Sequence, residues 1–346
     1  MRFGTRSRVL LLAGLVAGGG LAVPAVSAQR PPDREVAIVA VRPNFYMLAG
    51  AGANIGVSVG PDGFVVVDTG SAAMADATLA ALARLAERYT KTVQGGEIRP
   101  RIRHIFNTSA HPDHVGGNDK LARAGLTVFG TVGNAALGGV ITNNGGAAIL
   151  AHESVAERMS ADVNGTSAFP AGGWPSEGYI GRQRSYYMNG EAIHVVYQPA
   201  AYSDGDSIVT FRQSDVIVTG ELFDITRFPV IDVARGGSIR GTLEALSRLI
   251  DLAVPAVPFP WQPDRTLIVP ARGRICDQSD LVEYRDAMTI VRNAIDDMMR
   301  RGMTLDQIKS ANPARAYRTR YGSDTGPWTT NMFVEAVYTS LLADKT

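Results

Sequence analysis

Residues 107–118 constrain this chain more than any other stretch. They read Asn-Thr-Ser-Ala-His-Pro-Asp-His-Val-Gly-Gly-Asn and follow a β-branched and aromatic run at residues 102–106. That run predicts a short buried strand. His111, Asp113 and His114 are therefore expected on one tight loop at the carboxyl end of a strand, where neighbouring side chains can converge. Imidazole and carboxylate groups at this spacing suit a zinc ion.

The stretch resembles the signature loop of the metallo-β-lactamase superfamily, which runs His-x-His-x-Asp-His and is commonly followed by Gly-Gly-Asn. The positions that match are His111, Asp113, His114, Gly116, Gly117 and Asn118. Ser109 stands where the signature has its first histidine. The resemblance implies the fold of the superfamily, while one of its metal ligands is absent.

Three later segments resemble the remaining ligand loops of the superfamily, and each carries a substitution. Tyr202 lies in Ala-Tyr-Ser-Asp-Gly-Asp-Ser, which is similar to a family loop with histidine at that position. Glu221 replaces the aspartate that bridges two metals in a Thr-Gly-Asp-x-Phe loop. Arg272 lies in Pro-Ala-Arg-Gly and replaces the histidine of Pro-Gly-His-Gly. The resemblance spans about residues 36–277.

The substitutions fall on ligands of both metals. By the resemblance, the ligands of the first metal correspond to Ser109, His111 and Tyr202. Those of the second metal correspond to Asp113, His114 and Arg272. Serine and neutral tyrosine are weak zinc ligands, and a guanidinium is a permanent cation. A two-zinc centre is therefore not expected.

Two hypotheses place Arg272 differently. In the first, its guanidinium pairs with Asp113 and Glu221 and stands in for the missing metal, because buried carboxylates need a counter-charge. The site is then non-catalytic or strongly altered and binds a small molecule or a partner. In the second, Arg272 turns outward and one zinc is held by His111, Asp113, His114 and Glu221.

The second hypothesis makes the chain a hydrolase of an ester, lactone, thioester or lactam. Water on the zinc would be the nucleophile, with Asp113 as ligand or proton acceptor. A third hypothesis is metal-free catalysis with Tyr202 as acid, Arg272 as oxyanion partner and the Asp113/His114 pair as base. Fold alone does not choose among these three.

Alternating strand and helix patterns predict an α/β fold, and the resemblance makes it an αββα four-layer sandwich. Strands are expected at residues 36–40, 45–48, 55–59, 64–67, 192–197, 208–211, 216–219 and 267–269, and helices at 75–88, 118–124, 151–160 and 238–251. Residues 29–277 form the predicted metallo-β-lactamase-like domain. Residues 278–346 form a predicted C-terminal helical extension, with helices at 281–301, 305–310 and 332–343.

Asp68 ends the apolar run at residues 64–67 and has two interpretations. In the superfamily an aspartate at the corresponding place supports the metal loop without binding metal. Alternatively, Asp68 caps the next helix.

Residues 131–189 are expected to overhang the site. Their aromatic residues could form a wall over it or anchor the segment to the body: Trp174, Tyr179, Tyr186 and Tyr187.

Residues 1–28 are typical of an export signal. The positive start contains Arg2, Arg6 and Arg8, and residues 9–23 form the apolar run. Val26, Ser27 and Ala28 form a cleavage site of small residues. An uncleaved anchor helix is the alternative, but the run is short and rich in glycine for a membrane span. The mature chain is expected to be periplasmic or secreted, without membrane attachment.

Charge and cysteine content limit the classes of partner and the covalent links that are expected. The formal net charge is +1, and no basic block interleaved with aromatic residues is present. Nucleic-acid binding is therefore not expected. Cys276 is the single cysteine, so an internal disulfide is excluded and a buried thiol is predicted. The expected partner is a small molecule. The helical extension is expected to pack on the body or on a second copy of the chain, which would form a homo-oligomer.

Overall fold

The computed structural model describes residues 35–92, 100–126, 146–163, 166–256 and 265–344. These described residues belong to one compact unit. The predicted export signal lies outside the described residues. So does the first part of the predicted overhanging segment, up to residue 145.

The first sheet has seven strands in the order β1-β2-β3-β4-β5-β6-β9. Their bounds are β1 Ala37–Arg42, β2 Phe45–Ala51, β3 Ala53–Gly60, β4 Gly63–Val67, β5 Ile102–Phe106, β6 Ala148–His152 and β9 Glu177–Tyr179. Strands β1 to β4 form an antiparallel meander, and β5, β6 and β9 continue it in parallel. The carboxyl ends of β4 and β5 therefore lie next to each other, which brings Asp68 close to the histidine-containing stretch.

The second sheet has five strands in the order β10-β11-β12-β13-β14. Their bounds are β10 Gln183–Met188, β11 Glu191–Gln198, β12 Asp206–Phe211, β13 Val216–Val218 and β14 Leu267–Val269. A separate pair joins β7 Asp162–Val163 and β8 Thr166–Ser167. The strands predicted at residues 192–197 and 208–211 are confirmed as β11 and β12, which pair antiparallel.

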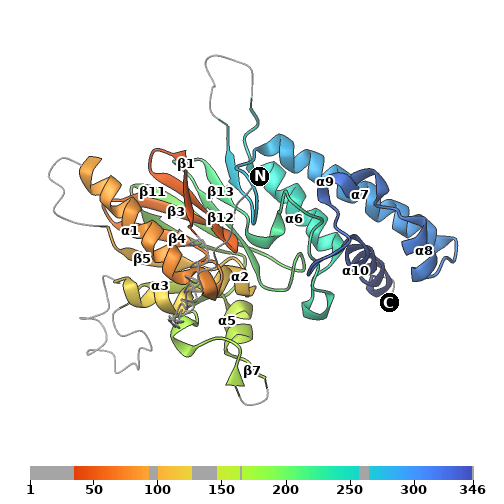
Figure 1. The fold of residues 1–346 in the computed structure, drawn as a ribbon, viewed down its shortest axis with the longest axis horizontal. Helices are drawn as coiled ribbons and strands as arrows, with labels where there is room; N and C mark the ends of the chain where they lie inside the picture. Colours follow the sequence, from red (N-terminus) through yellow and green to blue (C-terminus); the bar gives the residue numbers. More distant parts are fainter. Residues whose placement is uncertain (1–34, 93–99, 127–145, 164–165, 257–264, 345–346) are drawn as a thin grey trace, which may run out of the picture. The chain divides into compact units, whose positions relative to one another are not determined.

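Helices cover the outer faces of the two sheets (Figure 1). Helices α1 Ala75–Thr92 and α3 Asn118–Ala124 pack on the first sheet, where Leu85, Ile105 and Leu121 share one core cluster. The facing surfaces of the two sheets form a second core, in which Phe45 and Phe211 meet edge to face at 4.7 Å. Helices α6 Ile239–Leu252 and α7 Gln278–Arg300 pack on the second sheet. The predicted αββα four-layer arrangement is confirmed.

The C-terminal region is helical, as predicted, and packs on the body. Its helices are α7, α8 Leu305–Ala311, α9 Arg318–Tyr321 and α10 Thr330–Ala343. Phe333 of α10 stacks on Phe228 with ring centroids 4.6 Å apart, and both belong to the core cluster that contains α6. Cys276 is buried in the same cluster, and burial raises the pKa of its thiol to about 12. None of the helices in the described ranges is long and apolar enough to cross a membrane.

The remaining short elements lie in the loops. They are α2 Pro112–Val115, α5 Glu153–Ser160, η1 Ala72–Met74, η2 Ala171–Gly173, η3 Gly220–Leu222, η4 Val233–Arg235 and η5 Arg315–Tyr317. The helix predicted at residues 151–160 is wrong at its start, because β6 continues to His152. His152 then caps α5, and its Nδ1 lies 2.7 Å from Ser154 Oγ.

The aromatic wall is wrong for three of its four members. Tyr179 is buried in the core between the two sheets, and Tyr186 is partly buried and packs against that core. Trp174 packs beside Ala110 and Val115 under the histidine-containing stretch, and its Nε1 donates to Phe169 O at 3.0 Å. These residues anchor their segment to the body, as the alternative interpretation expected.

Candidate functional site

The histidine-containing stretch is a turn of helix and not a tight loop. His111 is the N-cap of α2, and Pro112 follows as the first residue, where a missing N–H costs nothing. His111 Nδ1 accepts a hydrogen bond from Asp113 N at 3.1 Å. The tight loop predicted here is therefore wrong for residues 112–115, because Pro112 is well suited to the first turn of a helix.

Gly116 and Gly117 allow α2 to approach the end of β4 closely. A Cβ atom on Gly116 would lie 2.4 Å from Ala72 N, and one on Gly117 would lie 2.5 Å from Thr69 O. Both contacts are with backbone, which cannot move aside easily. Asn118 completes the contact, because its Oδ1 accepts from Thr69 Oγ1 at 2.9 Å. The Gly-Gly-Asn motif therefore fixes the position of the histidine turn.

Asp68 supports this turn from the end of β4. It is fully buried and has a φ of 64°. Its carboxylate accepts from Thr108 N at 2.8 Å and from Thr108 Oγ1 at 2.7 Å, and it lies 2.6 Å from His114 Nδ1. The cap of the following helix η1 is Ser71, so the interpretation of Asp68 as a helix cap is wrong. Its supporting role is the one that the geometry shows.

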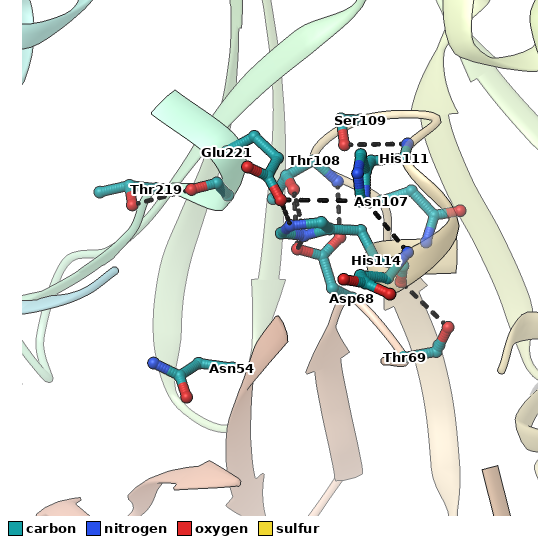
Figure 2. Close-up of polar contacts among 12 residues, drawn as sticks. Asn54, Asp68, Thr69, Asn107, Thr108, Ser109, His111, His114, Thr219 and Glu221 are labelled. Carbon is teal, nitrogen blue, oxygen red and sulfur yellow. Dashed lines mark hydrogen bonds and ion pairs between the residues drawn. The ribbon is translucent and has the colours of Figure 1, made fainter. Parts of the chain in front are cut away.

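His114 lies fully buried between two carboxylates (Figure 2). Its Nδ1 is 2.6 Å from Asp68 Oδ2, and its Nε2 is 3.0 Å from Glu221 Oε1. Burial by itself lowers the pKa of His114, but the charge and hydrogen bond of Asp68, followed by those of Glu221, raise it to about 10. His114 is thus an imidazolium that donates from both ring nitrogens, and neither nitrogen has a lone pair for a metal.

Glu221 is placed against the histidine turn by the glycine before it. Gly220 has a φ of 54°, and a Cβ there would lie 2.2 Å from Thr108 Oγ1. Glu221 is 4% exposed. Burial raises the pKa of its carboxyl, but the hydrogen bond from His114 and the charges of His114 and Arg272 hold that pKa well below its usual range. Glu221 is therefore an anion at neutral pH.

Arg272 points into the site and joins two of its carboxylates. Its Nη1 lies 2.7 Å from Glu221 Oε1, and its Nη2 lies 2.7 Å from Asp113 Oδ2. Asn54 fixes the backbone around Arg272, because its Nδ2 donates to the carbonyls of Pro270 and Gly273. Burial lowers the pKa of Arg272, but Glu221 and Asp113 raise it above its ordinary value. The pairing expected for the stand-in hypothesis is what the structure shows.

Two further charged residues belong to this cluster and were missed. Arg227 Nη2 lies 3.3 Å from Glu221 Oε2, and Arg227 Nε lies 2.8 Å from Asp224 Oδ2. Asp224 also lies 3.4 Å from Arg272 Nη1. The three-residue spacing of Asp224 and Arg227, just after Glu221, was the available signal. This signal was overlooked because only one residue of the corresponding family loop is a metal ligand.

The other ligand positions of the superfamily carry neutral groups. Burial lowers the pKa of His111, so its imidazole is neutral. Ser109 Oγ accepts a hydrogen bond from His111 N at 3.2 Å. The ring of Tyr202 packs against His111 with centroids 5.7 Å apart. Burial and then the charge of Glu221 raise the pKa of the Tyr202 phenol, which therefore stays protonated.

By distance alone, one group could hold a metal ion. Ligand atoms of His111, His114 and Glu221 lie within 4.8 Å of one another, while Asp113 is outside this group and binds Arg272. Three ligands are enough for a zinc site with an open position. As placed, however, Glu221 Oε1 accepts from Arg272 Nη1 at 2.7 Å, and the raised pKa of His114 favours a proton on each of its ring nitrogens. In this arrangement a zinc ion could bind only after Arg272 left Glu221 and His114 lost a proton.

Comparison with known proteins gives one family and several similar folds. The sequence model described as metallo-beta-lactamase superfamily matches residues 49–259. No curated protein sequence matches the chain. Among solved structures, the stereoselective inverting sec-alkylsulfatase Pisa1 from Pseudomonas sp. is 15% identical, with a TM-score of 0.56, and the match covers 88% of this chain and 50% of that one.

Two other solved structures show the same degree of similarity in sequence. A double mutant of the sec-alkyl sulfatase PisA1 is 14% identical, with a TM-score of 0.57 and coverage of 89% of this chain and 50% of that one. DIM-1 metallo-beta-lactamase is 13% identical, with a TM-score of 0.49 and coverage of 74% and 97%. This chain spans about half the length of the two sulfatase structures. At these identities the likeness shows the fold alone.

Proposed function

The chain belongs to the metallo-beta-lactamase superfamily, and from its altered site we propose that it works without a metal, as a binding protein for a small molecule. One observation carries the proposal. Arg272 takes the place of a family ligand and bonds Glu221 and Asp113 at 2.7 Å each. A guanidinium in that place repels a divalent cation and satisfies the carboxylates that would otherwise bind it.

Charge balance supports the proposal. The cluster contains four carboxylates, those of Asp68, Asp113, Glu221 and Asp224, and three cations, those of His114, Arg227 and Arg272. Buried carboxylates are costly unless cations compensate them. The side chain of Asp113 is 38% exposed, so the three cations balance the three carboxylates that are buried. A metal is therefore not required to stabilise the site.

Metal-free catalysis receives less support than binding. Its proposed oxyanion partner, Arg272, and one member of its proposed base, Asp113, are bonded to each other. The other member of the base, His114, is already protonated. Tyr202 remains a candidate acid, but a general acid needs a partner that accepts protons.

A single-zinc hydrolase is the second candidate, and one observation favours it. The ligand atoms of His111, His114 and Glu221 already lie within 4.8 Å of one another. Zinc binding would require His114 to lose a proton and Arg272 to leave Glu221. The substrate would then be an ester, lactone, thioester or lactam. Some proteins of the same fold are hydrolases, as the sulfatase and lactamase named above show.

Arg272→His is expected to gain zinc, because it removes the guanidinium and restores the family ligand. We expect the purified variant to bind zinc with at least tenfold higher affinity than the unmodified chain, measured by competition with a chromogenic chelator. Arg274→His is the matched control, since Arg274 lies two residues away and its side chain is 61% exposed. Equal zinc affinity of the two variants would show that the charge of Arg272 is not what excludes the metal.

We also propose that the chain is exported and cleaved before Gln29. The support is the order of positive, apolar and small residues within positions 1–28. Expression in a bacterial host followed by intact-mass measurement of the periplasmic fraction tests this. A mass that corresponds to a chain beginning at Gln29 is expected. A membrane-bound chain of full mass would instead indicate an anchor helix.

A further inference from the structure

A pocket of about 540 Å³ adjoins the site and is formed in part by the C-terminal helical region. This volume lies within the range of small-molecule sites. Its apolar lining comes from two parts of the chain, namely the loop before and within η4 and the start of α10: Val230, Ile231, Val233, Trp328, Met332 and Ala336. The helical region is therefore part of a candidate binding site as well as a cover for the second sheet.

Tyr202 connects this pocket to the altered metal site. It lines the pocket, and its ring lies 5.7 Å from the ring of His111. Asp232 N donates to Tyr202 O at 2.9 Å, which ties the pocket loop to the same residue. The residue that replaces a family metal ligand thus forms the wall between the charged cluster and an apolar space.

The pocket has no free charge for an ionic ligand. Its two acidic residues are already paired, because Asp232 Oδ2 lies 3.1 Å from Arg235 Nη1 and Glu335 Oε2 lies 2.7 Å from Lys309 Nζ. Among the residues that line it, all of them described, no lysine, arginine or histidine is present. An anionic ligand would meet two carboxylates and no lining cation. The lining therefore favours a neutral molecule.

One hydrogen-bond donor of the lining is available to a bound molecule. Tyr202 lines the pocket, and within the described part of the chain its hydroxyl forms no hydrogen bond to the protein. Trp328 Nε1 also lacks a partner, but it is buried below the pocket surface, where a ligand does not reach it. An oxygen atom on a bound molecule would accept a hydrogen bond from the Tyr202 hydroxyl in place of water.

We propose that this pocket binds a neutral, mainly apolar molecule that carries an acceptor oxygen, such as a medium-chain ketone. The inference rests on the proposed binding role and names the class of ligand for it. The apolar part packs against Ile231, Met332 and Ala336, and the oxygen accepts from the Tyr202 hydroxyl. The substitution at Tyr202 then has a positive role, because it builds a ligand wall where the family builds a metal site.

Isothermal titration calorimetry of the full chain with 2-octanone tests the proposal. Ala336→Trp fills the pocket and is expected to weaken binding at least tenfold. Leu342→Trp is the matched control, because Leu342 lies on the same helix, is 44% exposed and does not line the pocket. It should bind like the unmodified chain. Circular dichroism of each variant confirms that it is folded.

A milder variant and a second ligand keep the test decisive if Ala336→Trp does not fold. Tyr202→Phe removes the donor and keeps the aromatic ring, and it should weaken 2-octanone binding by about threefold to tenfold. Octanoate, which has the same chain length and a negative charge, should bind at least tenfold more weakly than the ketone. Octanoate binding as tight as that of the ketone would overturn the neutral ligand class.

Zinc analysis of the same samples separates this inference from the proposed function. A zinc-free protein that does not bind 2-octanone would overturn the pocket proposal and leave metal independence intact. Binding that is unchanged in a folded Ala336→Trp variant would also overturn it. A zinc-loaded protein that still binds the ketone in this pocket would overturn metal independence and leave the pocket proposal intact.

Discussion

Replacing Arg272 by alanine is expected to lower the free energy of unfolding by about 3–5 kcal/mol. The side chain is 19% exposed and bonds both Glu221, which is 1% exposed at its side chain, and Asp113. Removing the guanidinium leaves the buried anion of Glu221 without its closest arginine. The free energy lost in this way is larger than the contribution of an ordinary exposed ion pair. Urea unfolding at neutral pH, followed by circular dichroism, measures the change.

A surface ion pair provides the control for Arg272. Arg301 pairs with Asp297 on α7, and both side chains are at least 60% exposed. Arg301→Ala is expected to cost at most about 1 kcal/mol. Adding Glu221→Gln to Arg272→Ala should restore part of the lost stability, because the uncompensated charge is then gone. A loss in Arg272→Ala no larger than that in Arg301→Ala would show that Arg272 does not stabilise the cluster.

The stability of the protein is expected to fall as the pH rises from about 6.5 to about 10, through loss of the His114 proton. The ordinary pKa of histidine is 6.5, and the folded protein raises that of His114 to about 10. Between these values the folded state keeps a proton that the unfolded state has lost. The stabilisation is therefore complete below pH 6.5 and disappears as the pH passes 10. Its full size is on the order of 5 kcal/mol.

The comparison with His114→Gln isolates this contribution. Burial also raises the pKa of Asp206, to about 8, so the profile of the unmodified chain contains a second titrating group. The difference between the two profiles should decline with pH in the stated window. His194→Gln, on β11 away from the site, should keep the decline. Parallel profiles for the unmodified chain and His114→Gln would show that His114 is not held as a cation.

The fold could be predicted largely because its motifs are local. Gly-Gly-Asn at residues 116–118 requires close backbone contact, and the continuous apolar run of β4 indicates a strand covered on both faces. β10 was missed for a physical reason. It is an edge strand whose side chains are mostly exposed, so no apolar pattern marks it. β6 was missed because its alanine-rich sequence also suits a helix.

The charged cluster could be predicted only where a family ligand had changed. Arg272 was found because it replaces a histidine, and its pairing with Asp113 and Glu221 followed from charge alone. Arg227 could not be assigned in this way, since it replaces no ligand. The pocket beside Tyr202 could not be predicted either. It depends on how α10, which begins more than 120 residues after Tyr202, packs beside η4.

Zinc content of the mature protein, purified without chelator and then incubated with zinc and desalted, tests metal independence most directly. Far less than one zinc per chain in a folded protein is the predicted result. Near-stoichiometric zinc that falls sharply in both His111→Ala and His114→Ala would contradict it. In that case Arg272 would have to leave Glu221 when the metal binds, and the chain would be a candidate single-zinc hydrolase.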